Sequence, residues 1–139
     1  MATRSVSIKS ELSAVKAFLS ETETFLVQQG IGSSARFDIH LILEELLANI
    51  AQYAFDDTRD HRIDVRVTTA GGEVTIEIRD DGIAFDPTKQ PRPDTGSDIE
   101  ERQVGGLGMY LVGQLSDSFE YCRRGGMNTV QVSVSDRES

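Results

Sequence analysis

The spacing of apolar residues along the chain predicts helices in two regions. The stronger pattern lies between about residues 33 and 55, where apolar side chains recur every three or four positions. Its members are Ile39, Ile42, Leu43, Leu46, Leu47, Ile50 and Ala54. A weaker pattern predicts an earlier helix over about 11–29, capped by Ser10 or Ser13 and ended by glycines. We therefore expect a long central helix beside a shorter one.

Alternation of polar and apolar residues predicts strands. The alternating stretches are 5–9, 62–70, 73–80, 118–123 and 129–135. A glycine pair separates the second stretch from the third and another separates the fourth from the fifth, which is typical of hairpin turns. A short helix over about 107–115 precedes the last two strands. This order predicts an α/β (α+β) fold, a two-layer α/β sandwich with helices on one face of a mixed, mostly antiparallel sheet.

One long segment fits neither pattern. Residues 86–104 hold all three prolines of the chain and almost no large apolar residue, so they are not expected to form core. A polar stretch of this length inside a compact domain is typical of a functional loop. We predict that it forms a lid over a binding site, within a single domain that spans residues 1–139.

Composition narrows the classes of partner. The chain has 14 Lys and Arg against 23 Asp and Glu, a formal net charge of −9, which disfavours nucleic acid and anionic membranes as partners. The single Cys122 cannot form an intrachain disulfide, and we expect it to pack as an ordinary strand residue in a reducing compartment. The N-terminus lacks the apolar core of a signal peptide, and no apolar run approaches the ~18 residues of a membrane span. The expectation is a soluble, cytoplasmic protein.

Three fragments carry candidate chemistry, and the first is EELLAN at residues 44–49. At about 100° per residue, Glu45 and Asn49 project from neighbouring positions at the border of the apolar stripe, whereas Glu44 points to solvent. A carboxylate at position 45 suits a general base. The amide oxygen of Asn49 suits Mg²⁺ that takes its other ligands from water and phosphate. Taken alone, an amphipathic helix with two polar border residues explains the fragment at least as well.

The second and third fragments are DDGIAFDP at 80–87 and GGLGMYLV at 105–112. Asp-Gly directly after a strand is most often a simple turn. Glycines that open a helix leave backbone N–H groups and the positive end of the helix dipole free to meet phosphate, although a glycine hinge is the alternative. The Gly-Lys-Ser/Thr ending of a P-loop and the HRD and DFG motifs of protein kinases are absent from the sequence.

In their order and spacing, the three fragments resemble the ATP-binding boxes of the GHKL superfamily, the gyrase, Hsp90, histidine kinase and MutL ATPases. The resemblance covers about residues 5–134 and implies a Bergerat-type ATP-binding fold with ATP and Mg²⁺ as cofactors. It implies that Glu45 is the catalytic base and that Asn49 holds the metal. It further implies that Asp80 accepts a hydrogen bond from the adenine amino group and that Gly82 leaves room for the ring. The other nucleotide-binding positions that it implies are Ala84, Phe85, Gly105, Gly106, Leu107, Gly108 and Met109.

Two positions depart from the patterns of this superfamily. Ala84 stands where the superfamily pattern has a second glycine, which adds a methyl group near the expected nucleotide. Tyr53 stands where many of the resembling proteins have histidine. Its two interpretations are a place in the pocket lining and ordinary packing, and we favour packing.

Within the superfamily, the chain looks most like the small anti-sigma-factor serine/threonine kinases of bacterial partner switching. This resemblance implies transfer of the γ-phosphoryl group of ATP to a serine of a STAS-domain anti-sigma antagonist, alternate binding of a sigma factor, and a homodimer. Three alternatives stay open: a non-catalytic ATP-dependent protein-interaction switch, a detached histidine-kinase catalytic domain, and a plain ATP hydrolase.

Overall fold

The computed structural model describes residues 1–55, 61–89 and 106–137, and most of the lid predicted over 86–104 lies outside these ranges. The elements in chain order are β1 (Ala2–Lys9), α1 (Leu12–Gln28), α2 (Ser33–Tyr53), β2 (Arg62–Ala70), β3 (Glu73–Asp80), the 3₁₀ turn η1 (Pro87–Lys89), α3 (Gly106–Leu115), β4 (Ser118–Arg124) and β5 (Met127–Ser135). The three α-helices and five strands match the sequence predictions in type and order, with boundaries that differ by a few residues at most, whereas η1 was not predicted and lies in the segment expected to be a loop.

The five strands form one sheet in the order β1-β2-β3-β5-β4, and every pairing between them is antiparallel. The prediction of a mixed sheet is therefore wrong for the described strands. After β3 the chain forms α3 and re-enters the sheet as β4, which does not lie next to β3. The last strand, β5, pairs with both and lies between them, so β3 and β4, which run parallel to each other, do not pair.

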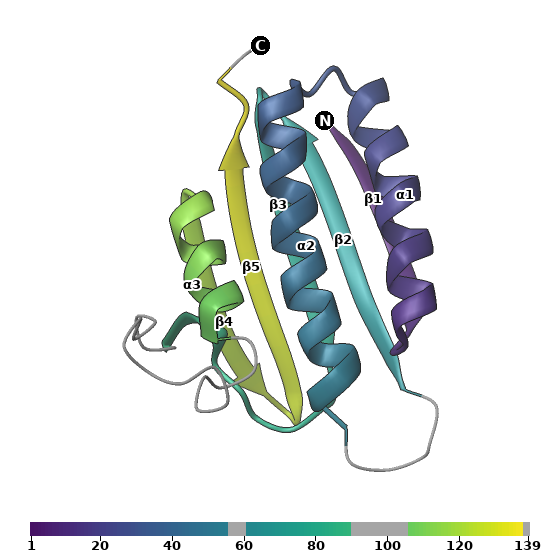
Figure 1. Cartoon of the computed structure of the whole chain (residues 1–139), viewed down its shortest axis with the longest axis vertical. Coiled ribbons are helices and arrows are strands. Elements are labelled where there is room, and N and C mark those ends of the chain that lie inside the picture. The colour runs from purple at the N-terminus through teal and green to yellow at the C-terminus, as the bar shows by residue number, and fades with distance from the viewer. Residues whose placement is uncertain (56–60, 90–105, 138–139) are drawn as a thin grey trace.

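All three helices cover the same face of the sheet, and α2 lies between α1 and α3 (Figure 1). Alternation along the strands produces this two-layer arrangement, because successive side chains point to opposite faces. In β2, for example, Ile63, Val65 and Val67 are buried beneath the helices, while the intervening Asp64 and Arg66 are exposed on the uncovered face. The predicted two-layer sandwich is thus confirmed.

The predicted apolar stripe of α2 forms the centre of the core. Six of its seven predicted members are buried, namely Ile39, Ile42, Leu43, Leu46, Leu47 and Ile50, and several of them are completely inaccessible to solvent. The seventh, Ala54, follows the last turn of α2 and is only partly buried, whereas Ala35 in the first turn is buried in addition. Phe18 and Leu26 of α1 join them from the side. Because the stripe is continuous, Glu45 and Asn49 at its border are held in fixed positions relative to the sheet.

Two details of the sequence prediction were wrong. The N-cap of α1 is Glu11 rather than Ser10 or Ser13, and it makes no side-chain capping hydrogen bond. The backbone N–H of Ser10 instead donates to the carbonyl of His61 (2.8 Å), which extends the pairing between β1 and β2. Cys122 is exposed rather than packed, because the alternation of β4 turns Tyr121 toward the covered face and Cys122 away from it.

Several chain segments meet at one end of the sandwich, opposite the two chain termini (Figure 1). The C-terminal ends of α2 and β3, the N-terminal end of α3 and the start of β5 all lie there. Among the described residues, no helix has both the length and the apolar character needed to cross a membrane.

The burial of α2 predicts a clear difference between two leucine substitutions. Leu47 is 0% exposed, so Leu47→Ala is expected to lower the free energy of unfolding by about 2–5 kcal/mol through lost contacts and the cavity left behind. Leu12 of α1 is 45% exposed, so Leu12→Ala should cost less than about 1 kcal/mol. Chemical denaturation of both variants measures the difference, and equal losses would contradict the assigned core.

Candidate functional site

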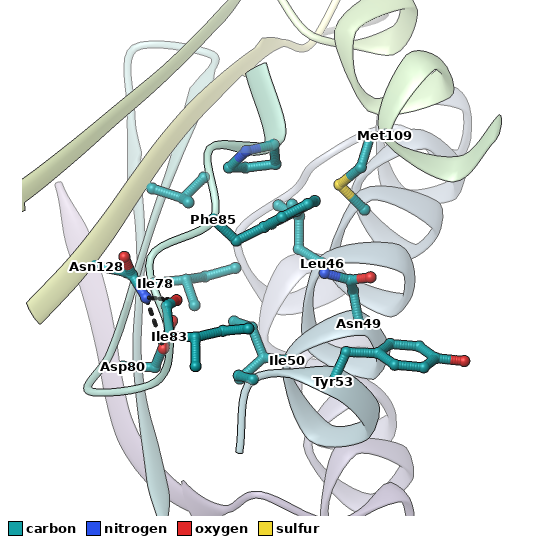
Figure 2. Close-up of a pocket in the computed structure, with 13 residues that line it drawn as sticks. Leu46, Asn49, Ile50, Tyr53, Ile78, Asp80, Ile83, Phe85, Met109 and Asn128 are labelled. Carbon is teal, nitrogen blue, oxygen red and sulfur yellow. Dashed lines mark hydrogen bonds between the residues drawn. The ribbon is translucent and has the colours of Figure 1, made fainter. Parts of the chain in front are cut away.

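A cavity of about 370 Å³ opens between α2, the loop after β3, the first turns of α3 and the start of β5 (Figure 2). Its volume lies in the range of small-molecule sites, about 300–1,000 Å³. Its wall is mostly apolar and consists of Leu46, Asn49, Ile50, Tyr53, Ala54, Ile78, Asp80, Ile83, Phe85, Pro87, Met109, Asn128 and Val130. A flat apolar ligand with a few polar groups fits such a wall.

Asp80 is the one acidic side chain in this wall. It is the last residue of β3, and the alternation of that strand places it on the same face as the buried Ile76 and Ile78. The carboxylate is only 4% exposed. Its Oδ1 accepts hydrogen bonds from the backbone N–H of Gly82 (2.8 Å) and from Nδ2 of Asn128 (3.1 Å). Among the described residues, no hydrogen bond ends on Oδ2, which therefore stays available to a donor in the cavity.

Gly82 allows the loop after β3 to approach the end of α2. A Cβ atom at this position would lie 2.6 Å from Cβ of Ala54 and 2.7 Å from its carbonyl oxygen, distances that no side chain tolerates. The neighbouring Ile83 N–H donates to the same carbonyl (3.0 Å). The resemblance assigned this glycine to the space around a purine ring, and the structure shows that packing against α2 requires it as well.

The two glutamates of α2 lie in different environments, as their helical positions predicted. Glu44 is exposed and lies 3.5 Å from the imidazole of His40, one turn earlier on the outer face. Glu45 is partly buried and faces α3. Its side chain lies directly against the backbone of Gly108, because a Cβ added there would be 2.7 Å from the carboxyl carbon of Glu45.

This environment changes the acidity of Glu45. Partial burial raises the pKa of the Glu45 carboxyl above its ordinary value, and the negative charge of Glu44 raises that pKa further. Once ionised, a carboxylate with a raised pKa is a stronger proton acceptor than an ordinary one. The position therefore suits a general base.

Asn49 and Tyr53 follow one turn apart on α2, and both line the cavity (Figure 2). Tyr53 is 47% exposed and lines the cavity, so the favoured interpretation as a packing residue is wrong and the alternative place in the pocket lining is correct. The part of the chain that the structure describes has no cluster of three or more His, Cys, Asp or Glu side chains that could hold a metal. A cation next to Asn49 would have to take most of its ligands from a bound nucleotide and water.

The other predicted nucleotide-binding residues divide into three groups. Phe85 and Met109 enter the cavity from opposite sides, one from the loop and one from α3 (Figure 2). Ala84 is exposed and is not part of the cavity wall. Gly106 and Leu107 form the start of α3, of which only the backbone is described, and Gly105 lies outside the described residues.

Asn128 belongs to the site but was missed in the sequence. It is the second residue of β5, is 4% exposed, and pairs in register with Asp80. The pattern did contain a signal, because Asn128 precedes Val130, Val132 and Val134 in the alternating row that faces the helices. A polar residue in such an apolar row is buried, and buried polar groups need partners.

An antiparallel sheet covered on one face by three helices, with an apolar cavity at one end of the sandwich, is the arrangement of a GHKL-type domain. The chain belongs to the histidine kinase-like ATPase domain family, whose sequence model matches residues 8–134. The resemblance inferred from the three sequence fragments is therefore confirmed.

Two curated relatives are similar to the chain over most of its length. The serine/threonine-protein kinase BtrW of Bordetella bronchiseptica is 32% identical over 93 residues, which cover 67% of this chain and 66% of BtrW. The serine-protein kinase RsbW of Listeria monocytogenes is 27% identical over 111 residues, which cover 73% of this chain and 71% of that RsbW. The chain thus matches about two thirds of the length of these kinases.

Two solved structures share the fold. The RsbU and RsbW domains of a Mycobacterium tuberculosis protein match 97% of this chain and 32% of their own, with a TM-score of 0.70 and 16% identity. The histidine kinase domain of the Erythrobacter litoralis EL346 blue-light activated kinase matches 89% of this chain and 62% of its own, with a TM-score of 0.53 and 19% identity. At these identities the structures establish the fold alone.

The contact between Glu45 and Gly108 predicts the effect of two glycine substitutions in α3. Gly108→Ala must displace the Glu45 carboxylate and should lower stability, whereas Gly113→Ala meets no atom closer than 4.0 Å. Since alanine favours helix, Gly113→Ala should be neutral or stabilise by up to ~1 kcal/mol. Thermal denaturation measures both. In the double variant Glu45→Ala/Gly108→Ala the loss should shrink, and strict additivity would show that Glu45 is not the obstacle.

The raised pKa of Glu45 predicts a pH dependence of stability. A carboxyl whose pKa is higher in the folded than in the unfolded protein stabilises the fold below the unfolded value, here near 4.5, and that contribution is lost as pH rises through the folded pKa. Glu45→Gln should remove this loss of stability at rising pH. Carboxyl NMR titration should show Glu45 ionising at higher pH than an ordinary glutamate, and Glu44→Gln should lower the pKa of Glu45. A Glu45 that titrates as an ordinary glutamate would contradict the assigned burial.

Proposed function

We propose that the chain is an ATP-binding serine/threonine protein kinase of the anti-sigma-factor type, which phosphorylates a STAS-domain anti-sigma antagonist in a bacterial partner-switching pathway. One observation carries the proposal: Glu45 lies partly buried between the cavity residue Asn49, one turn away, and the N-terminal turns of α3. The kinase names of BtrW and RsbW support the same assignment.

The cavity accounts for recognition of the nucleobase. Apolar side chains such as Ile50 and Phe85 provide surfaces for a purine ring, and Oδ2 of Asp80 provides an acceptor for an exocyclic amino group. An acceptor buried in an apolar wall favours a ligand that donates to it, because an unpaired buried carboxylate oxygen is costly. Adenine meets both requirements.

The N-terminal turns of α3 account for binding of the phosphates. Gly106 and Gly108 lie in the first turns of this helix, where backbone N–H groups lack helical partners and the dipole is positive. The helix therefore provides the positive potential that the acidic chain otherwise lacks. Asn49 would hold Mg²⁺ against the phosphates through its amide oxygen.

The remaining step is transfer of the phosphoryl group, for which bound ATP supplies the reactive γ-phosphate. Glu45 accepts the proton of the attacking serine hydroxyl, the serine oxygen forms a bond to the γ-phosphorus, and the bond to the β-phosphate oxygen breaks to leave ADP. The backbone N–H groups of α3 stabilise the negative charge on the leaving phosphates. The chain would act in the cytoplasm as a homodimer, and it would alternate between the antagonist and a sigma factor.

Three substitutions in α2 test this assignment. Glu45→Ala should leave nucleotide affinity nearly unchanged and lower phosphoryl transfer by ~10²–10⁴-fold, the usual contribution of a general base. Asn49→Ala should lower both affinity and transfer, with partial recovery at high Mg²⁺. Glu44→Ala is the matched control, since its side chain is exposed. It should leave nucleotide affinity unchanged and alter transfer only slightly, through the lowered pKa of Glu45. Calorimetry with Mg-ATP and a phosphorylation assay with a STAS-domain protein measure the two effects.

The assay also separates the alternatives. Nucleotide binding without transfer to any STAS-domain protein would indicate an ATP-dependent interaction switch, and phosphate release without a partner would indicate a hydrolase. Phosphoryl transfer at the wild-type rate in all three variants would contradict the role of Glu45. Failure to bind ATP at millimolar concentration would refute the nucleotide site itself.

A further inference from the structure

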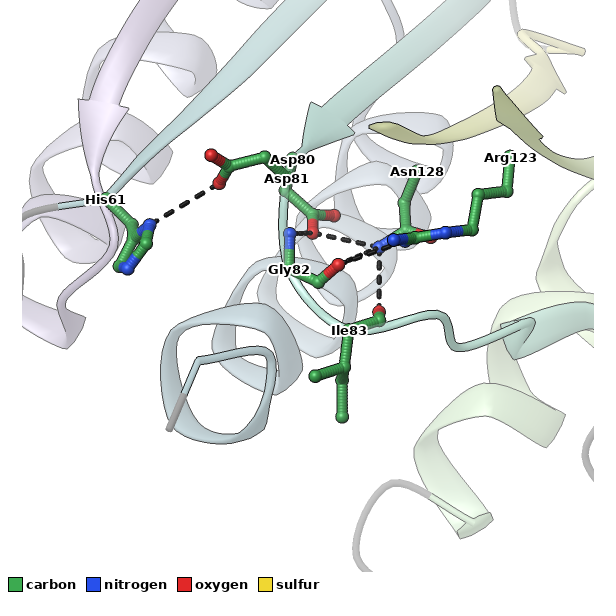
Figure 3. A network of polar contacts seen from close by, with 7 residues as sticks. All are labelled: His61, Asp80, Asp81, Gly82, Ile83, Arg123 and Asn128. Carbon is green, nitrogen blue, oxygen red and sulfur yellow. Dashed lines mark hydrogen bonds and ion pairs between the residues drawn. The ribbon is translucent and has the colours of Figure 1, made fainter. Parts of the chain in front are cut away.

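The hairpin of β4 and β5, which lies outside the three sequence fragments, contributes side chains to a network of polar contacts around the end of β3 (Figure 3). Asn128 on β5 lies beside Asp80, its partner in the sheet register. Tyr121 and Arg123 on β4 both donate hydrogen bonds to Asn128. The function proposed above assigns no role to Tyr121 or Arg123, and none to Asn128 beyond its place in the cavity wall.

The hydrogen bonds around Asn128 fix the orientation of its amide. Its Oδ1 accepts from the hydroxyl of Tyr121 and from Nη1 of Arg123 (2.9 Å). Its Nδ2 faces acceptors only: Oδ1 of Asp80 at 3.1 Å and the carbonyls of Ile83 at 2.9 Å and Gly82 at 3.4 Å. A flipped amide would place its NH₂ group against the guanidinium group of Arg123, which can only donate, and its oxygen against three acceptors, so only one orientation is satisfied.

The fixed amide in turn fixes the carboxylate of Asp80. Two N–H donors, from Gly82 and Asn128, hold Oδ1 and leave Oδ2 as the acceptor that lines the cavity. Both Asp80 and Asn128 are 4% exposed, so water cannot easily replace either donor. The carboxylate therefore has little freedom to rotate toward a ligand of different shape.

Arg123 also holds the loop that forms the wall next to Asp80. Its Nη1 donates to the carbonyl of Gly82 (3.0 Å) as well as to Asn128. This single guanidinium group thus joins the edge strand β4 to the turn that follows β3 (Figure 3). A hydrogen bond donated by a charged group is stronger than one donated by a neutral group, typically by about a factor of two.

We propose that Asn128, held in one orientation by Tyr121 and Arg123, is a positioning residue that makes the site selective for a purine with an exocyclic amino group at the position facing Asp80. The inference rests on the proposed function, since it concerns the nucleobase of the same nucleotide. An amino group donates to Oδ2 of Asp80. A carbonyl at that position, as in guanine, places two acceptors against each other and is rejected.

The test compares the dissociation constants of two ligands, Mg-ATP and the Mg²⁺ complex of purine riboside triphosphate, which lacks the 6-amino group. Wild-type protein is expected to bind ATP ~10-fold or more tightly, the worth of one hydrogen bond to a charged group. Asn128→Ala and Arg123→Ala should weaken ATP binding ~5–10-fold and change binding of the analogue less than ~2-fold, because only the contact with the amino group depends on the orientation of Asp80. The ratio of the two constants should approach one.

Two further variants keep the test independent of folding defects. Tyr121→Phe removes one hydroxyl and keeps the ring, so it should reduce the ratio by a smaller factor, ~2–3-fold, even if Asn128→Ala fails to fold. Arg124→Ala is the matched control, because Arg124 is the next residue of β4, is exposed, and donates none of the hydrogen bonds to Asn128 or Gly82. It should leave both dissociation constants unchanged.

The outcomes are distinct. Equal weakening of both ligands in the Asn128, Arg123 and Tyr121 variants would show that the network supports the fold without selecting the nucleobase, and unchanged ratios would likewise overturn the proposal. Wild-type protein that binds neither ligand would refute the proposed function rather than this inference.

Discussion

Burial of the apolar stripe of α2 against the sheet is the interaction on which the candidate site depends. The stripe is inaccessible to solvent along most of its length, so α2 cannot rotate without exposing residues such as Ile42 and Leu47. Rotation by one position would also exchange the environments of Glu44 and Glu45. The same apolar packing that stabilises the fold therefore decides which carboxylate faces α3 and which faces solvent.

A second constraint is the cost of a carboxylate in an apolar wall. Asp80 is buried where the neighbouring strand residues are isoleucines, and an isolated charge there would destabilise the protein. The turn at Gly82 and the amide of Asn128 offset this cost with two hydrogen bonds to one oxygen. What remains is an acceptor of defined direction, which is the property a selective binding site needs.

The site combines parts of very different origin along the chain. The proposed general base, Glu45, comes from the middle of α2, and the proposed phosphate site comes from the start of α3. The carboxylate proposed to face the nucleobase, Asp80, comes from the end of β3. Their convergence follows from the topology, because α2 and β3 run toward the same end of the sandwich and α3 starts there (Figure 1). The topology of the fold, rather than proximity in sequence, therefore brings these three segments together.

Periodicity in the sequence alone determined the elements, the two-layer arrangement and the direction of Glu45, because these depend on local geometry and on the separation of apolar from polar residues. The three fragments were enough to indicate the family. Only the tertiary structure revealed the antiparallel pairing of β3 with β5, the contact between Glu45 and Gly108, and the place of Tyr53 at the rim of the cavity. The role of Asn128 also required the fold. It lies 48 residues from Asp80 in sequence, and only the register of two strands that are not consecutive brings the two side chains within hydrogen-bonding distance.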